Sequence, residues 1–162
     1  MASGALLMSK LNSFLFVCAG NICRSPSLKG ILEHQLKQKK ITAYVESCGI
    51  YASFLGSPPD QRMQEVAKAH GLKLENRAKL FEASFFDEFD AIFCVTKEIL
   101  EAVAASAHQK EFLDKLYLAT HFSKNHRDQE IPDPYYSGAK GFESVWSLME
   151  EACEGIIAHF YP

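Results

Sequence analysis

The sequence predicts an α/β protein in which helices cover both faces of an open parallel sheet. Ser13–Val17 and Asp90–Val95 are short, nearly continuous apolar runs, which are typical of strands buried on both faces. Segments with apolar residues at helical spacing follow both runs, so strands alternate with helices. A broad apolar stripe between Phe142 and Phe160 predicts a final helix that packs on the rest of the protein.

The first predicted unit consists of a strand, a loop and a helix. Ser13–Val17 forms the strand and leads into a loop that contains Gly20. Ser25 and Pro26 suit the cap and first turn of a helix, whose apolar residues recur over 28–36. Open parallel sheets bind ligands beyond the carboxyl ends of their strands, so we expect chemistry in the loop directly after this strand.

The same alternation continues to the C-terminal end of the sequence. Further strands are predicted over 43–47, 90–95 and 115–119, and further helices over 63–70, 99–107 and 142–160. Gly71 is the expected stop of the helix over 63–70. The polar segment from Thr120 to Tyr136 contains two prolines and is predicted to be a long loop, a kind of segment that is often functional in compact domains.

Length and composition predict one globular domain. The chain has 162 residues and 48% apolar content, and we expect a single core over 13–162 with a flexible N-terminal extension over 1–12. A net charge of −3 gives no general attraction for nucleic acid or anionic lipid, and no segment is typical of a secretory signal or a membrane span.

The five cysteines lack the spacing of a disulfide framework, which favours reduced thiols in the cytoplasm. We expect the protein to be a monomer or a weak dimer.

A cysteine and an arginine frame the loop after the first strand. The loop reads Cys18-Ala19-Gly20-Asn21-Ile22-Cys23-Arg24-Ser25-Pro26. A short loop at a helix N-terminus can direct its backbone N–H groups at phosphate oxygens, and Arg24 adds a planar fork that holds two of them. The same positive environment favours a thiolate at Cys18, which can attack phosphorus, while Ser25 can donate its hydroxyl to that sulfur.

The residues from Val17 to Pro26, together with Asp133-Pro134-Tyr135-Tyr136 far downstream, resemble the low-molecular-weight protein tyrosine phosphatase family. The resemblance extends over essentially the whole chain from about Ser13, with both motifs in the order and separation of the family. It implies a four-stranded parallel sheet in the order 2-1-3-4. It also implies hydrolysis of phosphotyrosine in proteins, or of aryl phosphates, through a phosphocysteine intermediate.

The resemblance also implies roles for individual residues. Cys18 is the expected nucleophile, Arg24 the clamp on the transition state and Asp133 the general acid. A carboxylic acid on a loop across the site can protonate the leaving oxygen and then act as base on water, which agrees with that role for Asp133. The remaining expected contacts are Ala19, Gly20, Asn21, Ile22, Cys23 and Ser25 around the phosphate and Phe54, Tyr135 and Tyr136 as aromatic walls.

Two positions depart from the family pattern. Asn76 stands where many relatives carry a histidine that supports the phosphate loop, and Thr96 replaces an aspartate after the third strand. We expect Asn76 to substitute in part for the histidine, with Ser47 still bonded to Asn21. Cys23 is similar to the second cysteine of the family, which can form a reversible disulfide with the nucleophile.

Three other functions compete with this interpretation. A thioredoxin-linked arsenate reductase needs two further redox cysteines after the third strand, and only Cys94 lies in that region. A protein arginine phosphatase has threonine where Ile22 stands. An inactive phosphotyrosine-binding or redox-sensing module does not need a leaving-group acid, so the presence of Asp133 argues against it. No cofactor is implied, and the histidines have no metal-ligand spacing.

Overall fold

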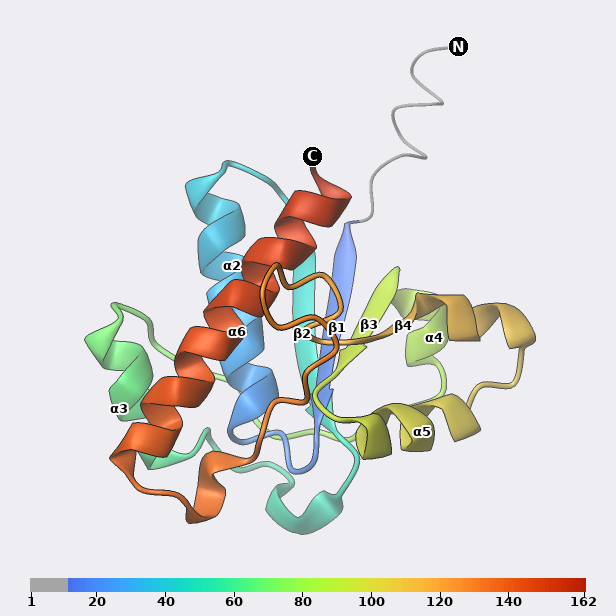
Figure 1. Cartoon of the computed structure of the whole chain (residues 1–162). Helices are drawn as coiled ribbons and strands as arrows, with labels where there is room; N and C mark the ends of the chain where they lie inside the picture. Colours follow the sequence, from blue (N-terminus) through green and yellow to red (C-terminus); the bar gives the residue numbers. More distant parts are fainter. Residues whose placement is uncertain (1–11) are drawn as a thin grey trace.

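The computed structural model describes residues 12–162 and contains a four-stranded parallel sheet in the order β2-β1-β3-β4. The strands are β1 (Ser13–Cys18), β2 (Tyr44–Gly49), β3 (Ala91–Cys94) and β4 (Leu116–Leu118), and the helices are α2 (Arg24–Gln38), α3 (Gln61–Ala69), α4 (Phe85–Glu88), α5 (Lys97–Ala105) and α6 (Ala139–Phe160). Short 3₁₀ turns cover Ala52–Phe54, Lys110–Lys115 and Pro134–Tyr136. The predicted fold class and strand order are therefore confirmed (Figure 1).

The centre of the sheet is apolar because its strands are covered on both faces. Every residue of β1 is buried, and β1 pairs with both β2 and β3. Phe16 on β1 stacks on Phe93 of β3 with ring centroids 5.5 Å apart. Such aromatic pairs between neighbouring strands add to the free energy gained by burial alone.

Helices lie on both sides of the sheet (Figure 1). The long helix α6 packs along α2 on one side, and α3 lies against α6. The helices α4 and α5 lie on the other side, where α5 contacts β3 and β4. The apolar stripe predicted over 142–160 is the buried face of α6, and its Trp146 is fully buried.

The segments that carry the predicted site converge at one end of the molecule. The loop after β1, the turn at Ala52–Phe54 after β2 and the turn at Pro134–Tyr136 before α6 all lie at the lower edge of Figure 1. This edge is formed by the carboxyl ends of the parallel strands. The topology thus brings together sequence segments that lie more than a hundred residues apart.

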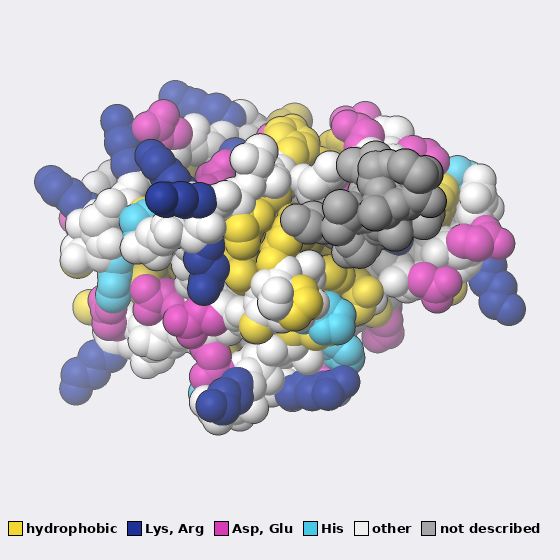
Figure 2. All heavy atoms as spheres, turned by 90° about the horizontal axis from the view of Figure 1, so that it is seen from above, with side chains coloured by type: hydrophobic (Ala, Val, Ile, Leu, Met, Phe, Trp, Pro, Cys, Tyr) yellow, Lys and Arg dark blue, Asp and Glu magenta, His cyan; other side chains and the backbone are white. Residues whose placement is uncertain are grey.

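The opposite end of the molecule carries no predicted site residue. Figure 2 views this end and shows hydrophobic side chains gathered among charged ones. Tyr44, at the start of β2, is 57% exposed and stacks on Phe89. Phe14, near the start of β1, packs against Phe160 of α6.

Two details of the sequence-based prediction need correction. The first is that α4 was not predicted, because four residues are too short to show a helical period. The second is that Ser25 does not cap α2, which begins one residue earlier, at Arg24, and has no side-chain cap. The Ser25 hydroxyl is used inside the loop instead. The predicted extension falls almost wholly on residues 1–11, which lie outside the described residues.

Candidate active site

The loop between β1 and α2 combines a buried cysteine, a buried arginine and backbone N–H groups that are unpaired among the described residues. Cys18 ends β1 and is 2% exposed, and Arg24 begins α2. Among the described residues, no hydrogen bond is donated by the backbone N–H groups of residues 19–23. Unpaired N–H groups at a helix N-terminus favour a negatively charged guest, which satisfies them and interacts with the helix dipole.

The end of β2 holds this loop in place. Ile50 and Tyr51 donate their backbone N–H groups to the Ala19 carbonyl, each at 2.9 Å. Gly49 makes the close approach possible, because a Cβ atom there would lie 2.6 Å from the Ala19 oxygen. Any side chain at Gly49 would therefore push the loop away from the strand.

Asn21 organises the inside of the loop. Its backbone is left-handed, with φ of 57°, a conformation that asparagine tolerates better than most residues. Its side chain is fully buried and donates to Ser25 Oγ at 2.8 Å and to Ser47 Oγ at 3.0 Å. Its Oδ1 accepts the backbone N–H of Lys79 at 3.0 Å. One amide thus links β2, α2 and the segment after α3.

Asn76 completes this network from outside the loop. It accepts the Ser47 hydroxyl at 2.8 Å and donates through Nδ2 to the backbone oxygen of Asn21 at 3.2 Å. Ser47 thereby accepts from Asn21 and donates to Asn76. The other departure, Thr96, accepts the Ile99 N–H and caps α5, so it contributes to that helix rather than to the loop.

Ser25 lies directly beside the sulfur of Cys18. The two atoms Cys18 Sγ and Ser25 Oγ are 3.0 Å apart, and both residues are buried. Ser25 Oγ accepts from Asn21 and also lies 3.2 Å from the Cys48 carbonyl, to which it can donate. The hydroxyl hydrogen can therefore turn to the sulfur when the sulfur carries a negative charge.

The thiols of the other four cysteines ionise less readily than an ordinary cysteine. Burial raises the pKa of the Cys23 thiol, and the nearby Cys18 and Asp133 raise it further. Burial also raises the pKa of Cys48, Cys94 and Cys153. These thiols stay protonated at neutral pH, and the thiolate is the nucleophilic form of cysteine.

Arg24 connects the loop to the segment that carries Asp133. Its guanidinium is almost fully buried and donates through one terminal nitrogen to the Ile131 carbonyl at 3.0 Å. The other terminal nitrogen lies 3.6 Å from Asp133 Oδ2. The Asp133 side chain is 47% exposed, and its Oδ1 accepts the backbone N–H of Tyr135 at 3.0 Å. The carboxyl group therefore stands at the mouth of the loop.

Aromatic side chains flank this mouth. Phe54 and Tyr135 have ring centroids 6.1 Å apart, with their planes at 50°. Phe54 also lies over Gly20, where a Cβ atom would come within 2.8 Å of the ring. The predicted wall residue Tyr136 falls in the turn before α6, but its side chain lies outside the described part of the structure. Phe54 and Tyr135 thus form two neighbouring walls.

Several contributors to the site were not predicted from the sequence. They are Gly49, the Lys79 backbone, the Ile131 carbonyl and Asp60, whose N–H donates to the Ile22 carbonyl at 2.6 Å. Most of them act through the backbone, which leaves little trace in residue type. Of these contributors, only Gly49 could have been predicted from its residue type, because a glycine at the end of a strand indicates close approach of another backbone.

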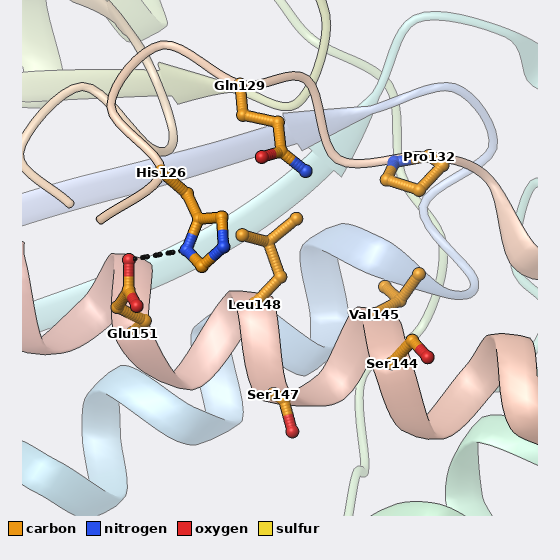
Figure 3. A pocket seen from close by; sticks show the side chains of 8 residues that line it. All are labelled: His126, Gln129, Pro132, Ser144, Val145, Ser147, Leu148 and Glu151. Atoms are coloured by element: carbon orange, nitrogen blue, oxygen red, sulfur yellow. Dashed lines mark hydrogen bonds and ion pairs between the residues drawn. The ribbon is translucent and has the colours of Figure 1, made fainter. Parts of the chain in front are cut away.

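A hollow of about 470 Å³ lies away from the loop after β1, between α6 and the segment before Asp133 (Figure 3). His126 and Glu151 form a hydrogen bond at one side, and Gln129 points toward Leu148. Pro132 lies at the other side. None of its lining residues is a cysteine, and none belongs to the loop after β1.

Comparison with protein families gives one description over nearly the whole chain. The family model described as low molecular weight phosphotyrosine protein phosphatase matches residues 13–160. A putative low molecular weight protein-tyrosine-phosphatase of Synechocystis is 35% identical over 145 residues, which cover 88% of this chain and 92% of that protein. A low molecular weight phosphotyrosine protein phosphatase of Gallus gallus is 29% identical over 151 residues, which cover 91% and 95%.

Solved structures show the same similarity. A protein tyrosine phosphatase of Entamoeba histolytica has a TM-score of 0.87 at 30% identity, covering 91% of this chain and 95% of that chain. A drosophila arginine phosphatase has a TM-score of 0.84 at 32% identity, covering 92% and 98%. Both are similar to this chain over almost their whole length.

Proposed function

Since the chain belongs to the low molecular weight phosphotyrosine protein phosphatase family, we propose that it hydrolyses phosphotyrosine in proteins with Cys18, Arg24 and Asp133 as its catalytic residues. The observation that carries the assignment of residues is their convergence at one loop. Cys18 Sγ lies 3.0 Å from Ser25 Oγ, and Arg24 at the end of the same loop lies 3.6 Å from Asp133.

In the first step the Cys18 sulfur attacks phosphorus in line with the leaving oxygen. A sulfur–phosphorus bond forms and the bond from phosphorus to the phenolic oxygen breaks. Asp133 gives its proton to that oxygen, so the product leaves as a neutral phenol rather than a phenolate. The exposed position of Asp133 at the mouth of the loop suits contact with the leaving group.

In the second step water hydrolyses the phosphocysteine. Asp133, now a carboxylate, accepts a proton from water while the oxygen attacks phosphorus. The phosphorus–sulfur bond breaks, and the electron pair returns to the Cys18 sulfur. Ser25 donates its hydroxyl to the departing thiolate across the 3.0 Å contact.

Arg24 and the loop stabilise the charge on the transferred phosphoryl group. The backbone N–H groups of residues 19–23 have no acceptor among the described residues and take equatorial oxygens. Arg24 exchanges its contact with Asp133 for two further oxygens, a geometry that suits its planar fork. Asn21 keeps the loop in the conformation that directs these donors inward.

The aromatic walls favour a phenyl ester over an alkyl ester. A phenyl ring inserted between Phe54 and Tyr135 needs the two wall rings at roughly 9 Å from each other, about twice the separation of a stacked pair. The rings are 6.1 Å apart here, so they must separate as the substrate ring enters. The alkyl chain of phosphoserine would gain less from these walls.

Arginine phosphatase activity remains the rival to exclude, because a drosophila arginine phosphatase has the same fold. Ile22 is 8% exposed in the loop, in the position for which threonine is expected in that branch. A methyl-rich side chain there offers no hydrogen bond to a guanidinium. For arsenate reduction, Cys94 is fully buried in β3, which does not suit a cysteine that must exchange disulfides.

The test compares initial rates on phosphotyrosine, phosphoserine and phosphoarginine peptides near pH 6, for the wild type and Cys18→Ser. We expect phosphotyrosine to be preferred and Cys18→Ser to lose turnover while it still binds vanadate. Cys94→Ser is the matched control, and it should keep the wild-type rates. Hydrolysis that survives Cys18→Ser would mean that another group is the nucleophile.

The role of Asp133 is tested with leaving groups of different basicity. Asp133→Asn should slow phenyl phosphate by about 10²–10⁴-fold, the usual contribution of a general acid. The same change should affect p-nitrophenyl phosphate far less, because that leaving group needs little protonation. An equal loss for both substrates would remove Asp133 as the acid.

For Cys23 we propose a role in reversible oxidation. It is a buried free thiol in the same loop as Cys18. Peroxide should convert the Cys18 thiolate to a neutral sulfenic acid, which removes one of the charges that raise the Cys23 pKa. The Cys23 sulfur should then bond to the Cys18 sulfur, while the Cys23 proton and the sulfenic hydroxyl leave as water. After excess peroxide, activity should return with dithiothreitol in the wild type, whereas in Cys23→Ser the unprotected sulfenic acid should be oxidised on to a sulfinic acid that dithiothreitol does not reduce. Equal recovery in both would contradict the role.

The cellular location and the oligomeric state of the protein are also proposals. No helix in the described range 12–162 is long and apolar enough to cross a membrane. The described cysteines are all free thiols, which agrees with the reducing conditions of the cytoplasm. We propose a cytoplasmic monomer or weak dimer, and sedimentation velocity over a range of concentrations would distinguish the two from a stable oligomer.

A further inference from the structure

A hollow of about 330 Å³ opens beside the aromatic wall, between α3 and the first turn of α6. Its side chains come mainly from one face of α3 and from the start of α6. They include Arg62, Glu65, Val66, Ala69, Phe142 and Glu143. The proposed mechanism uses none of them.

Arg62 joins this hollow to the proposed substrate site. Its guanidinium carbon lies 5.0 Å from the centroid of the Tyr135 ring and 4.7 Å from the centroid of the Phe142 ring. One face of the hollow is therefore continuous with the wall that contacts the substrate ring. Arg62 thus contacts both the Tyr135 ring and the Phe142 ring that lines the hollow.

The position of Arg62 is tied to the phosphate loop. Asp60 holds the guanidinium through Arg62 Nε at 3.3 Å and through a terminal nitrogen at 3.1 Å. The backbone N–H of Asp60 in turn donates to the Ile22 carbonyl at 2.6 Å. The hollow therefore keeps a defined position relative to the phosphate loop.

The chemistry of the lining favours an apolar guest. Two of the three charged side chains have partners, since Arg62 pairs with Asp60 and Glu143 bonds to His70 at 2.6 Å. The third, Glu65, is exposed to solvent. The half-buried Val66 and the exposed Ala69 leave carbon surface open between them. Covering that surface with an aliphatic side chain lowers the free energy by roughly 25 cal/mol per Å².

We propose that the hollow is a subsite for an apolar side chain that flanks the phosphotyrosine of a substrate protein. This inference rests on the proposed function, because it needs the phosphotyrosine ring to lie against Tyr135. An extended peptide advances by about 3.3–3.6 Å per residue, so a residue within about three positions of the phosphotyrosine can reach the hollow. The hollow thereby selects among phosphotyrosine sequences without taking part in the chemistry.

The test uses phosphotyrosine peptides that carry Leu, Ala or Asp at each of the three positions on either side. For the wild type we expect one position at which Leu raises kcat/KM by about tenfold over Ala, mainly through KM. Ala69→Glu places a carboxylate in the hollow and should abolish that preference. Ala102→Glu is the matched control, because Ala102 is an exposed alanine of α5, and it should keep the preference.

Hydrolysis of phenyl phosphate distinguishes failure of the proposed function from failure of the subsite alone. It lacks flanking residues, so Ala69→Glu should change its kcat/KM by less than about twofold. A wild type that does not hydrolyse phenyl phosphate would overturn the proposed function and the subsite with it. Normal phenyl phosphate hydrolysis with no preference for Leu at any position would overturn the subsite alone. A preference that persists in Ala69→Glu and in the uncharged, hollow-filling Ala69→Met would do the same.

Discussion

Asn21 is the residue on which the shape of the phosphate loop depends most. Its left-handed backbone turns the loop, and its buried amide bonds Ser25, Ser47 and the backbone of Lys79. Buried amides are costly when unpaired, so each of these partners matters. Asn76 supplies the remaining contacts, to Ser47 and to Asn21 itself. The rigidity of the loop is therefore a property of four side chains and not of the motif alone.

The substitution Asn76→Ala tests this network. It removes the acceptor of the Ser47 hydroxyl and a donor to Asn21, so it should lower the free energy of unfolding by about 1–3 kcal/mol. The looser loop should also lower kcat on phenyl phosphate. Urea denaturation and initial rates measure the two effects. Asn76→His, which can keep a donor and an acceptor, should retain more of both. Unchanged stability and kcat in Asn76→Ala would show that the network is not needed.

At the scale of elements, α6 positions the segment that carries the proposed acid. Glu151 on α6 accepts from Ser123 Oγ and from the backbone N–H of Asn125, and pairs with His126 at 2.9 Å. The segment then runs to Ile131, whose N–H donates to the Val95 carbonyl at 2.9 Å. The approach to Asp133 is thus held by a helix on one side and by the end of β3 on the other.

The anchor at Glu151 predicts a pH dependence. Hydrogen bonds from Ser123, and then from His126, lower the pKa of Glu151 from 4.5 to about 2. A lowered pKa in the folded state means stabilisation that is present above pH 4.5 and is lost as the pH falls toward about 2. Wild type should therefore be more stable than Glu151→Gln near pH 6.

Urea denaturation between pH 6 and pH 2 measures this difference in the free energy of unfolding. The difference between wild type and Glu151→Gln should shrink as the pH falls through this window. Glu154→Gln is the control on the same helix, because the Glu154 carboxylate accepts no hydrogen bond from the segment over 120–133 among the described residues. A constant difference at every pH would contradict a charge-dependent anchor.

At the scale of the whole molecule, the site follows from the strand order. The chain moves from β1 outward to β2 and then returns past β1 to β3. Loops therefore leave the sheet in opposite directions on either side of β1, which creates a crevice at its carboxyl end. Cys18 lies at that end, and the turns that carry Phe54 and Asp133 border the same edge. The proposed domain over 13–162 contains all of these parts.

Removing residues 1–11 tests this domain boundary. The sheet begins at Ser13 and the family match begins at the same residue, so the shortened chain should keep its stability within about 0.5 kcal/mol and its kcat/KM on phenyl phosphate. Thermal unfolding and initial rates measure both. Removing residues 1–16 is the control, because it deletes most of the buried strand β1 and should prevent folding. Loss of cooperative unfolding in the first deletion would contradict the boundary.

Much of the fold could be predicted because its elements have a strong local pattern. Parallel strands buried on both faces leave apolar runs such as Ser13–Val17, and a helix that packs along a sheet leaves a stripe such as that of α6. The short helix α4 left no such pattern, because four residues span about one turn and Phe86 packs on Phe112, which is distant in the sequence. The ends of helices depend on tertiary contacts too. Ser25 was predicted to cap α2, but its hydroxyl contacts the Cys18 sulfur instead.

For the site, the sequence by itself determined the contiguous part: a cysteine, a five-residue loop and an arginine at the start of a helix, with their family. Only the tertiary structure decided which backbone groups and close approaches complete it, among them the Lys79 N–H, Gly49 and the Ile131 carbonyl. A loop motif is read from neighbouring residues because the chain itself sets their spacing. Contacts across the fold depend on how strands and helices pack, and many of them use backbone atoms that every residue type shares.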